Sequence, residues 1–314
     1  MSVLYISYDG MLEPLGQSQV LAYLKKLTSN RTIHLISFEK PEDWVNVVER
    51  ERLKREIAAS GIFWHPMRYH KRPTVLATTW DIANGLRVAL WLVLRHRLHI
   101  VHARSYIPSV ISLMLKNLVG VRFIFDMRGF WADEKVDGGS WRKGSRIYQV
   151  TKWFERRFLL SADHVVSLTH AAVPIIQKFS YLQDRMPPVS VIPTCADLTR
   201  FKPIPRKRGN TGLMIGYVGT AGNWYLFDKT ADCFAELLRR RPDTKFLIVN
   251  RGEHAYISKS LNAAGVPSEA VELITAVPSE MPQLIARMDA SVFFIKPVFS
   301  KQASAATKLA ELLG

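Results

Sequence analysis

The chain has 314 residues, 48% hydrophobic and 22% charged, which is enough for two globular domains and too apolar for a disordered protein. Its two cysteines exclude a disulfide framework and favour a reducing compartment. The net charge of +16, with 28 basic and 17 acidic side chains in residues 1–200, indicates an anionic partner.

The chain starts directly with a strand pattern, without the basic segment and cleavage site of a signal peptide. The longest apolar run, residues 88–94, is far shorter than the ~20 residues of a membrane span. We therefore expect a cytoplasmic protein.

Short β-rich segments alternate with amphipathic helical segments through the first two thirds of the chain. A helical stripe of Val20, Leu24 and Leu27, for example, follows the first strand pattern. The predicted strands are residues 3–7, 33–37, 100–103, 123–125, 165–168 and 189–192. This alternation predicts a parallel sheet with helices on both faces.

The same alternation restarts after a Pro-, Gly- and basic-rich stretch, residues 201–210, which we interpret as a linker. Strands are predicted at residues 213–218, 245–249 and 291–295, and helices at 228–240 and 278–288. The sequence thus predicts an α/β protein with two Rossmann-like, doubly wound halves, residues 1–203 and 204–314.

Glycine turns follow the first predicted strand of each half, where doubly wound sheets bind ligands. Residues 9–19 contain Gly16, and residues 216–225 contain Gly219. A glycine in either turn would let the backbone approach an anion closely.

A third turn follows the strand at 291–295 and leads into a helix that we expect to open with Ser304 and Thr307. Ser304, Lys308 and Glu311 are spaced i, i+4 and i+7, so they would share one face of that helix. A hydroxyl, a cation and a carboxylate on one face suit a diphosphate beside a ribose diol.

Six stretches resemble, in order, the family-4 glycosyltransferases of the GT-B fold that build bacterial surface polysaccharides. They are residues 9–19, 101–105, 123–134, 191–197, 216–225 and 296–311. The resemblance implies two Rossmann-like domains that face a cleft, with the acceptor on the first and a nucleotide-diphosphate sugar on the second. It also implies transfer of the sugar with retention to a glycan or lipid-linked acceptor, without a metal or another cofactor.

The resemblance also implies roles for single residues. It assigns donor binding to Gly16, Gln17, Gly219, Thr220, Ser304, Thr307, Lys308 and Glu311. It places Asp126 and Arg128 at the reacting centre, and Arg104, Asp133 and Glu134 on the acceptor side.

The sequence departs from the family at three places. Ala303 replaces the first carboxylate of the family's Glu-x(7)-Glu pattern, and Thr220 stands where a basic residue is common. Relatives continue with further strands and a helix beyond the position of Gly314. We therefore expect an incomplete second domain in a truncated chain.

Structural interpretations remain open beside these roles. Lys308 and Glu311 also fit a surface ion pair, and Gly16 and Gly219 fit ordinary turn glycines. Asp126, Arg128, Asp133, Glu134 and Arg104 also fit a structural ion network.

Residues 80–97 fit either a helix that covers the core or an interfacial helix on anionic lipid, next to a basic loop at residues 65–72. The second interpretation makes the protein peripheral on the inner face of the membrane. No nucleic-acid motif accompanies the basic charge, so we expect no nucleic-acid partner.

Two other functions remain open: a non-catalytic remnant that binds nucleotide-sugar, and a nucleotide-sugar epimerase of the same fold.

Overall fold

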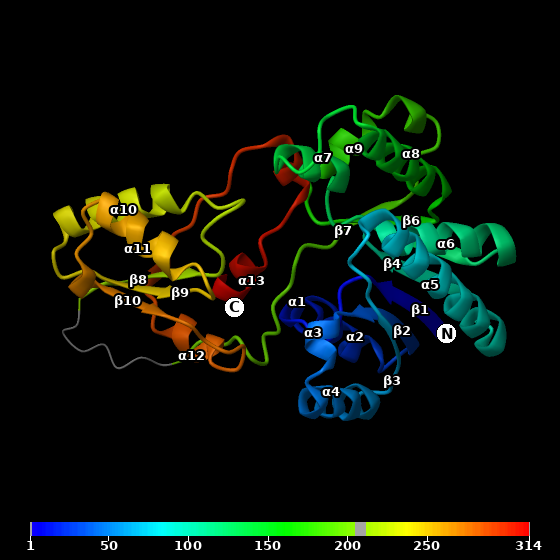
Figure 1. The fold of residues 1–314 in the computed structure, drawn as a ribbon, viewed down its shortest axis with the longest axis horizontal. Coiled ribbons are helices and arrows are strands. Elements are labelled where there is room, and N and C mark those ends of the chain that lie inside the picture. The colour runs from blue at the N-terminus through cyan, green and yellow to red at the C-terminus, as the bar shows by residue number, and fades with distance from the viewer. Residues whose placement is uncertain (1, 205–211, 314) are drawn as a thin grey trace. The chain divides into compact units, whose positions relative to one another are not determined.

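The computed structural model describes residues 2–204 and 212–313, which form two compact units (Figure 1). The first unit comprises Met1–Thr194 and Phe299–Ala305, and the second comprises Cys195–Val298 and Ala306–Gly314. The chain therefore leaves the first unit after Thr194 rather than after residue 203, and a short later segment returns to it. Most of the linker predicted at 201–210 lies outside the described residues.

The first unit is built on a parallel seven-stranded sheet with the order β3-β2-β1-β4-β5-β6-β7. Its strands are β1 (Ser2–Ser7), β2 (Thr32–Glu39), β3 (Ile62–Arg68), β4 (Ile100–Arg104), β5 (Arg122–Asp126), β6 (His164–Ser167) and β7 (Val189–Val191). The strand order reverses between β1 and β4, and this reversal is the position where doubly wound sheets bind ligands.

Strand β3 was not predicted, and it includes part of the segment that we expected to be a basic loop. It lies at the sheet edge and contains Pro66, which lacks an N–H group and is tolerated there. Its mixed apolar and polar sequence hides the alternation on which the prediction depends.

Helices cover both faces of this sheet. On one face α2 (Ala22–Leu27) and α4 (Val47–Ala59) pack against Ile33 and Leu35 of β2. On the other face lie α5 (Thr74–His96), α6 (Tyr106–Val119) and α8 (Arg146–Ser161), which enclose Phe123 and Phe125 of β5 and the neighbouring strands. Shorter helical segments are α1 (Pro14–Gly16), the π-helical turn η1 (Gln17–Leu21), α3 (Pro41–Trp44), α7 (Trp131–Asp137), α9 (Ala172–Gln177), η2 (Ser180–Leu182) and η4 (Phe299–Ala303).

The second unit has a parallel four-stranded sheet with the order β10-β9-β8-β11. Its elements are β8 (Met214–Val218), α10 (Phe227–Arg240), β9 (Lys245–Val249), α11 (His254–Ala263), η3 (Ser268–Ala270), β10 (Val271–Ile274), α12 (Met281–Ala286), β11 (Ala290–Ser291) and α13 (Thr307–Leu313). A core of Tyr217, Phe227, Phe234, Phe246 and Ile248 fills one side of this sheet. The α/β class with two parallel, Rossmann-like sheets is confirmed.

The strand predicted at 291–295 is wrong in length, because β11 ends at Ser291. Beyond it the backbone pairs with the loop after β8 instead of with β8 itself. Leu226 N–H donates to Phe294 O at 2.9 Å, and Lys296 N–H donates to Trp224 O at 2.9 Å.

Candidate functional site

The carboxyl ends of three neighbouring strands bring charged residues together in the first unit. The register of β1, β4 and β5 places Ser7, Arg104 and Asp126 side by side. Arg104 Nε donates to Asp9 Oδ2 at 3.1 Å, and Arg128 Nη1 lies 3.9 Å from Asp126 Oδ1. The structure therefore brings together Arg104, Asp126 and Arg128, which the sequence assigned to the acceptor side and the reacting centre.

Polar atoms of this cluster are buried without hydrogen-bond partners. Arg104 and Asp126 are both 4% exposed, and neither Arg104 Nη1 nor Asp126 Oδ1 has a partner among the described residues. Burial pushes the pKa of Asp126 upward, but His102, Arg128 and Arg104 outweigh it and leave that pKa below its usual value. Asp126 is therefore a carboxylate at neutral pH with a free acceptor position.

The backbone is strained at the ends of the same strands. Ser105, directly after β4, has φ 71°, and Arg128, two residues beyond β5, has φ 57°. Non-glycine residues rarely adopt these values, and such strain is concentrated at functional sites. The turns thus hold Arg104 and Arg128 in positions that an unstrained chain would not select.

Gly16 and Gln17 lie next to the loop after β1. Gly16 is buried at the end of α1, and a Cβ atom there would lie 2.0 Å from Gly10 O. The loop itself is anchored by Glu39, which accepts the N–H groups of Met11 and Leu12 at 2.9 and 3.0 Å. Gly16 therefore has a packing role, and its contact with a donor, like that of Gln17, stays a prediction.

Asp133 and Glu134 lie on α7 and have partners within the first unit. Asp133 accepts hydrogen bonds from Tyr148 and Lys152 at 2.9 and 3.1 Å, and Glu134 pairs with Lys301 at 3.0 Å. These contacts favour the structural interpretation of both carboxylates. Their acceptor role stays a prediction.

In the second unit, the glycine turn after β8 is fixed by a carboxylate. Glu253 accepts the N–H groups of Ala221 and Gly222 at 2.8 and 2.9 Å. Asn250, at the end of β9, donates to Gly219 O at 2.9 Å and to Glu253 Oε2 at 3.0 Å. This network holds the turn in one conformation.

Lys308 reaches into this turn from α13. A Cβ atom at Gly219, where φ is 93°, would lie 3.3 Å from Lys308 Cε, so only glycine fits comfortably there. Thr220, the next residue, is exposed. The lysine and the turn are thus neighbours, as the sequence predicted.

The ammonium of Lys308 is buried in an aromatic cage. The residue is 7% exposed, and Nζ has no hydrogen-bond partner among the described residues. Nζ lies 3.6 Å from the ring centre of Tyr225, 4.6 Å from that of Tyr217 and 5.2 Å from that of Phe293. Burial lowers the pKa of Lys308 to about 7, and Glu253 opposes this shift. These contacts contradict the interpretation of Lys308 as part of an exposed ion pair.

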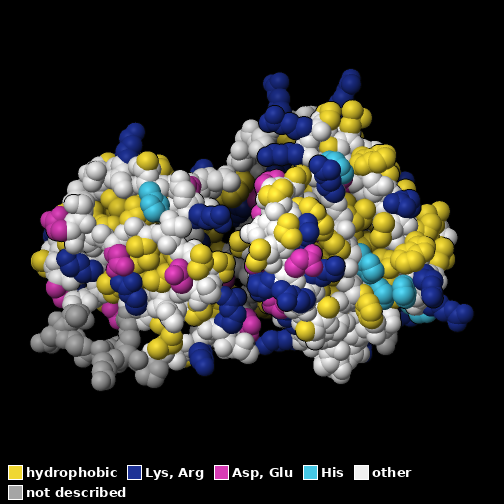
Figure 2. Space-filling view, turned by 60° about the horizontal axis from the view of Figure 1, so that its bottom comes forward, with side chains coloured by type: hydrophobic (Ala, Val, Ile, Leu, Met, Phe, Trp, Pro, Cys, Tyr) yellow, Lys and Arg dark blue, Asp and Glu magenta, His cyan; other side chains and the backbone are white. Residues whose placement is uncertain are grey.

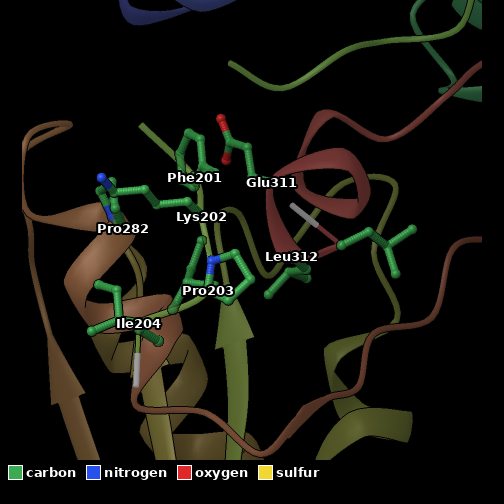
Figure 3. A pocket seen from close by; sticks show the side chains of 10 residues that line it. Phe201, Lys202, Pro203, Ile204, Pro282, Glu311 and Leu312 are labelled. Atoms are coloured by element: carbon green, nitrogen blue, oxygen red, sulfur yellow. The ribbon is translucent and has the colours of Figure 1, made fainter. Parts of the chain in front are cut away.

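Glu311, one turn further along α13, lines a cavity of about 310 Å³ (Figure 3). The lining comes from residues 201–204, from α12 and from α13, and most of the lining residues are apolar. Burial raises the pKa of Glu311, and Arg200 opposes the rise. Lys308 does not line this cavity.

Ser304 does not belong to the helix that carries Lys308 and Glu311. Helix α13 begins at Thr307, so the predicted shared face of Ser304, Lys308 and Glu311 is wrong. The physical reason is that residues 299–305 pack on the first unit. Ser300 N–H donates to Asp137 Oδ2 at 2.9 Å, and Ala303 is buried in the core beside α7.

Ser304 instead lies against the first unit's own turn. A Cβ atom at Gly129, next to Arg128, would lie 3.4 Å from Ser304 Oγ. Thr307 is the first residue of α13 and is half-buried.

Sequence reasoning missed His102, Asn250 and Glu253. His102 Nε2 lies 3.6 Å from Asp126 Oδ2, and it is two residues from Arg104 on the same strand. The period-two alternation of strands would have placed both on one face. Nothing in the sequence marks Glu253, because the N–H groups that it accepts in the glycine turn, those of Ala221 and Gly222, lie more than thirty residues away.

The described residues contain neither a metal-binding cluster nor a membrane-spanning helix. No group of three His, Cys, Asp or Glu side chains there is arranged to hold a metal ion. In the same residues, no helix is both long and apolar enough to cross a bilayer.

Comparison with known proteins identifies the larger part of the first unit. Residues 39–193 match the family described as glycosyl transferase 4-like domain. This part of the chain is therefore similar to a glycosyl transferase 4-like domain. No curated protein matches the sequence.

Solved structures agree with this domain in fold. The chain is similar to Anabaena Alr3699/HepE in complex with UDP and glucose, with 13% identity, a TM-score of 0.62, and coverage of 96% of this chain and 76% of that one. It is also similar to sucrose-phosphate synthase from Thermosynechococcus elongatus, with 9% identity, a TM-score of 0.63, and coverage of 93% and 74%. The lipopolysaccharide outer core galactosyltransferase WaaB is similar as well, with 13% identity, a TM-score of 0.55, and coverage of 94% of this chain and 74% of that one.

At these identities the similarity shows the fold alone. It confirms the GT-B fold class, whereas the cleft expected between the two halves stays a prediction.

Proposed function

We propose that this protein is a glycosyltransferase that moves a sugar from a nucleotide-diphosphate sugar to a glycan or lipid-linked acceptor, with retention at the anomeric carbon. The glycosyl transferase 4-like domain supports the class of reaction. The similar Anabaena protein was solved with UDP and glucose, which supports a donor of this kind.

The observation that carries the proposal is the unpartnered ammonium of Lys308. A buried cation without a partner is costly, and a diphosphate on Nζ would supply the missing hydrogen bonds and the opposite charge. The turn at Gly219 lies against the same side chain, so a phosphate there would also meet backbone groups. We assign the diphosphate to Lys308, Gly219, Thr220 and Thr307, and the ribose to Glu311.

The departing diphosphate determines which charge this site must stabilise. When the bond between the anomeric carbon and the diphosphate breaks, negative charge develops on the diphosphate oxygen. A positioned cation stabilises that charge, and such preorganised contacts typically contribute ~3 kcal/mol. The acceptor oxygen forms the new bond to the anomeric carbon on the face that the diphosphate leaves, as retention requires, and its proton passes to the departing diphosphate oxygen.

We assign the acceptor to the charged cluster of the first unit. Asp126 is ionised and has a free oxygen, so it can accept the hydrogen bond of an acceptor hydroxyl. Arg104 and Arg128 lie beside it and would orient polar groups of the acceptor or the sugar. We propose that no metal ion takes part and that the protein works at the cytoplasmic side of a membrane.

The test is a calorimetric titration of the chain with UDP, GDP, ADP and their sugars. We expect one nucleotide to bind selectively, and Lys308→Ala to weaken it tenfold or more, since charge-assisted contacts are worth ~1.5–3 kcal/mol. Lys259→Ala, an exposed lysine of α11, is the matched control. Equal affinity in both variants would remove Lys308 from the donor site.

Product analysis separates the alternative functions. A transferase releases nucleoside diphosphate in proportion to the glycosylated acceptor. An epimerase would convert the donor sugar without release, and a non-catalytic remnant would bind the donor without changing it.

A further inference from the structure

The inference concerns the outer surface of α5, α6 and α8, the three helices that cover one face of the first sheet. Helix α5 contacts α6, and α6 contacts α8, so the three form one layer (Figure 1). Their inner sides fill the core, but their outer sides expose large apolar residues.

Helix α5 carries the longest apolar stripe. At 3.6 residues per turn the stripe spans roughly 60° of the helix and contains Leu76, Trp80, Trp91 and Leu94. Arg87 lies within the same sector. Trp80 is 59% exposed and Trp91 is 58% exposed. A tryptophan that is more than half exposed is unusual on a surface that meets only water.

The neighbouring helices extend this surface. On α6, Met114 and Leu118 are exposed at a spacing of four residues. On α8, Val150 and Trp153 are exposed at a spacing of three. We call the outer side of these three helices the outer face.

The charge of the outer face has one sign. The three helices contain just two carboxylates, Asp81 and Glu155, and both are buried. Asp81 accepts hydrogen bonds from Tyr8 at 2.8 Å and from His70, and Glu155 accepts one from Tyr106 at 2.5 Å. These acids therefore add no exposed negative charge.

The exposed charges of the outer face are basic. They belong to Arg87 and Arg95 on α5 and to Arg146, Arg156 and Arg157 on α8. Figure 2 shows one face of the molecule, where Lys and Arg side chains and some Asp and Glu side chains lie among exposed hydrophobic ones.

Helix α4, on the opposite face of the sheet, provides the contrast. It also exposes apolar residues, Val47 and Val48, but its acids Glu49, Glu51 and Glu56 offset three of its four basic residues. The combination of exposed tryptophan with uncompensated arginine therefore distinguishes the outer face from the other helical layer of the same unit.

From this combination we propose that the outer face docks on an anionic lipid bilayer. Tryptophan and leucine enter the headgroup boundary, and arginine meets the anionic headgroups. Since no helix of the described residues can cross a bilayer, the contact is peripheral. The proposal does not depend on the transferase reaction.

The test is vesicle flotation of the full chain. Vesicles of phosphatidylcholine alone are compared with an equimolar mixture of phosphatidylcholine and phosphatidylglycerol, at low and high salt. We expect binding to the anionic vesicles alone and its loss at high salt, because salt screens the arginine contacts.

Variants locate the contact. Each basic residue near an anionic surface contributes a factor of roughly five, so Arg87→Gln with Arg95→Gln should lower partitioning at least tenfold. Trp80→Gln with Trp91→Gln should lower it similarly, whereas Val47→Gln with Val48→Gln on α4 should leave it unchanged. Lys308→Ala should also leave it unchanged, which separates this proposal from the donor site.

Three outcomes would overturn the proposal. They are failure to bind anionic vesicles, equal loss in the α4 variant, and a dimer in solution that the tryptophan variant abolishes. The last result would assign the outer face to a second copy of the chain. Thermal unfolding of each variant verifies that it is folded.

Discussion

Replacement of Lys308 by methionine should make the ligand-free protein more stable while it abolishes donor binding. A fall in the lysine pKa from 10.5 to about 7 corresponds to roughly 5 kcal/mol of burial cost. Cation–π contacts with Tyr225 and Tyr217 recover ~2 kcal/mol of this. Methionine fills similar volume without a charge, so we expect a net gain of about 3 kcal/mol.

The stability that Lys308→Met gains over the unmodified protein should decrease as pH rises. In the unfolded chain Lys308 titrates near 10.5, and in the folded chain near 7. Between these values the unfolded state binds more protons, so the stability of the unmodified protein rises with pH. The advantage of the methionine variant should be complete below pH 7 and should disappear as pH approaches 10.5.

Calorimetric unfolding at several pH values measures this effect, with nucleotide titration of the same samples. We expect Tm to rise by roughly 6–12 °C at pH 6.5. Lys259→Met is the control, since that side chain is exposed. A lower Tm in Lys308→Met would show that the aromatic cage stabilises the ammonium by more than its burial costs, and unchanged donor affinity would refute the ligand role.

Four further predictions concern the donor, the reaction and the first unit. Donor affinity, measured by calorimetry with a nucleotide-sugar, should be constant below pH 7 and fall above it, because a bound diphosphate raises the pKa of Lys308. A donor affinity that stays constant up to pH 9 would contradict this. Arg128→Ala should lower turnover more than donor affinity in a steady-state assay, whereas an equal loss of both would indicate a structural role. EDTA should leave turnover intact, and inhibition that magnesium reverses would contradict the metal-free mechanism. Gly16→Ala should cost ~1–3 kcal/mol in urea unfolding, because its Cβ would lie 2.0 Å from Gly10 O; a change below 0.5 kcal/mol would contradict the packing role.

Local patterns predicted most of the fold. The segments 3–6 and 123–125 are continuously apolar, and continuous runs mark strands that helices cover on both faces. The edge strands β3 and β10 lack this signal and were missed, although the other two edge strands, β7 and β11, were predicted. The helix of residues 80–97 was predicted, although it begins earlier, at Thr74.

The sequence by itself determined the alternation of strands and helices, the two glycine turns and the nearness of Lys308 to Glu311 along one helix. These properties depend on neighbours within a few residues, so local spacing reveals them. The resemblance to family-4 glycosyltransferases predicted that Asp126, Arg128 and Arg104 lie together. The structure gives the physical reason, because β4 and β5 are parallel neighbours that end at one edge of the sheet.

Tertiary structure alone decided the environment of each site. The cage of Lys308 comes from β8, the following loop and the segment after β11, and Glu253 fixes the turn from beyond β9. Ser304 was misplaced because Glu134 and Asp137 of α7 hold residues 299–305 on the first unit. Such contacts join residues up to 167 positions apart, and no periodicity within a segment can encode them.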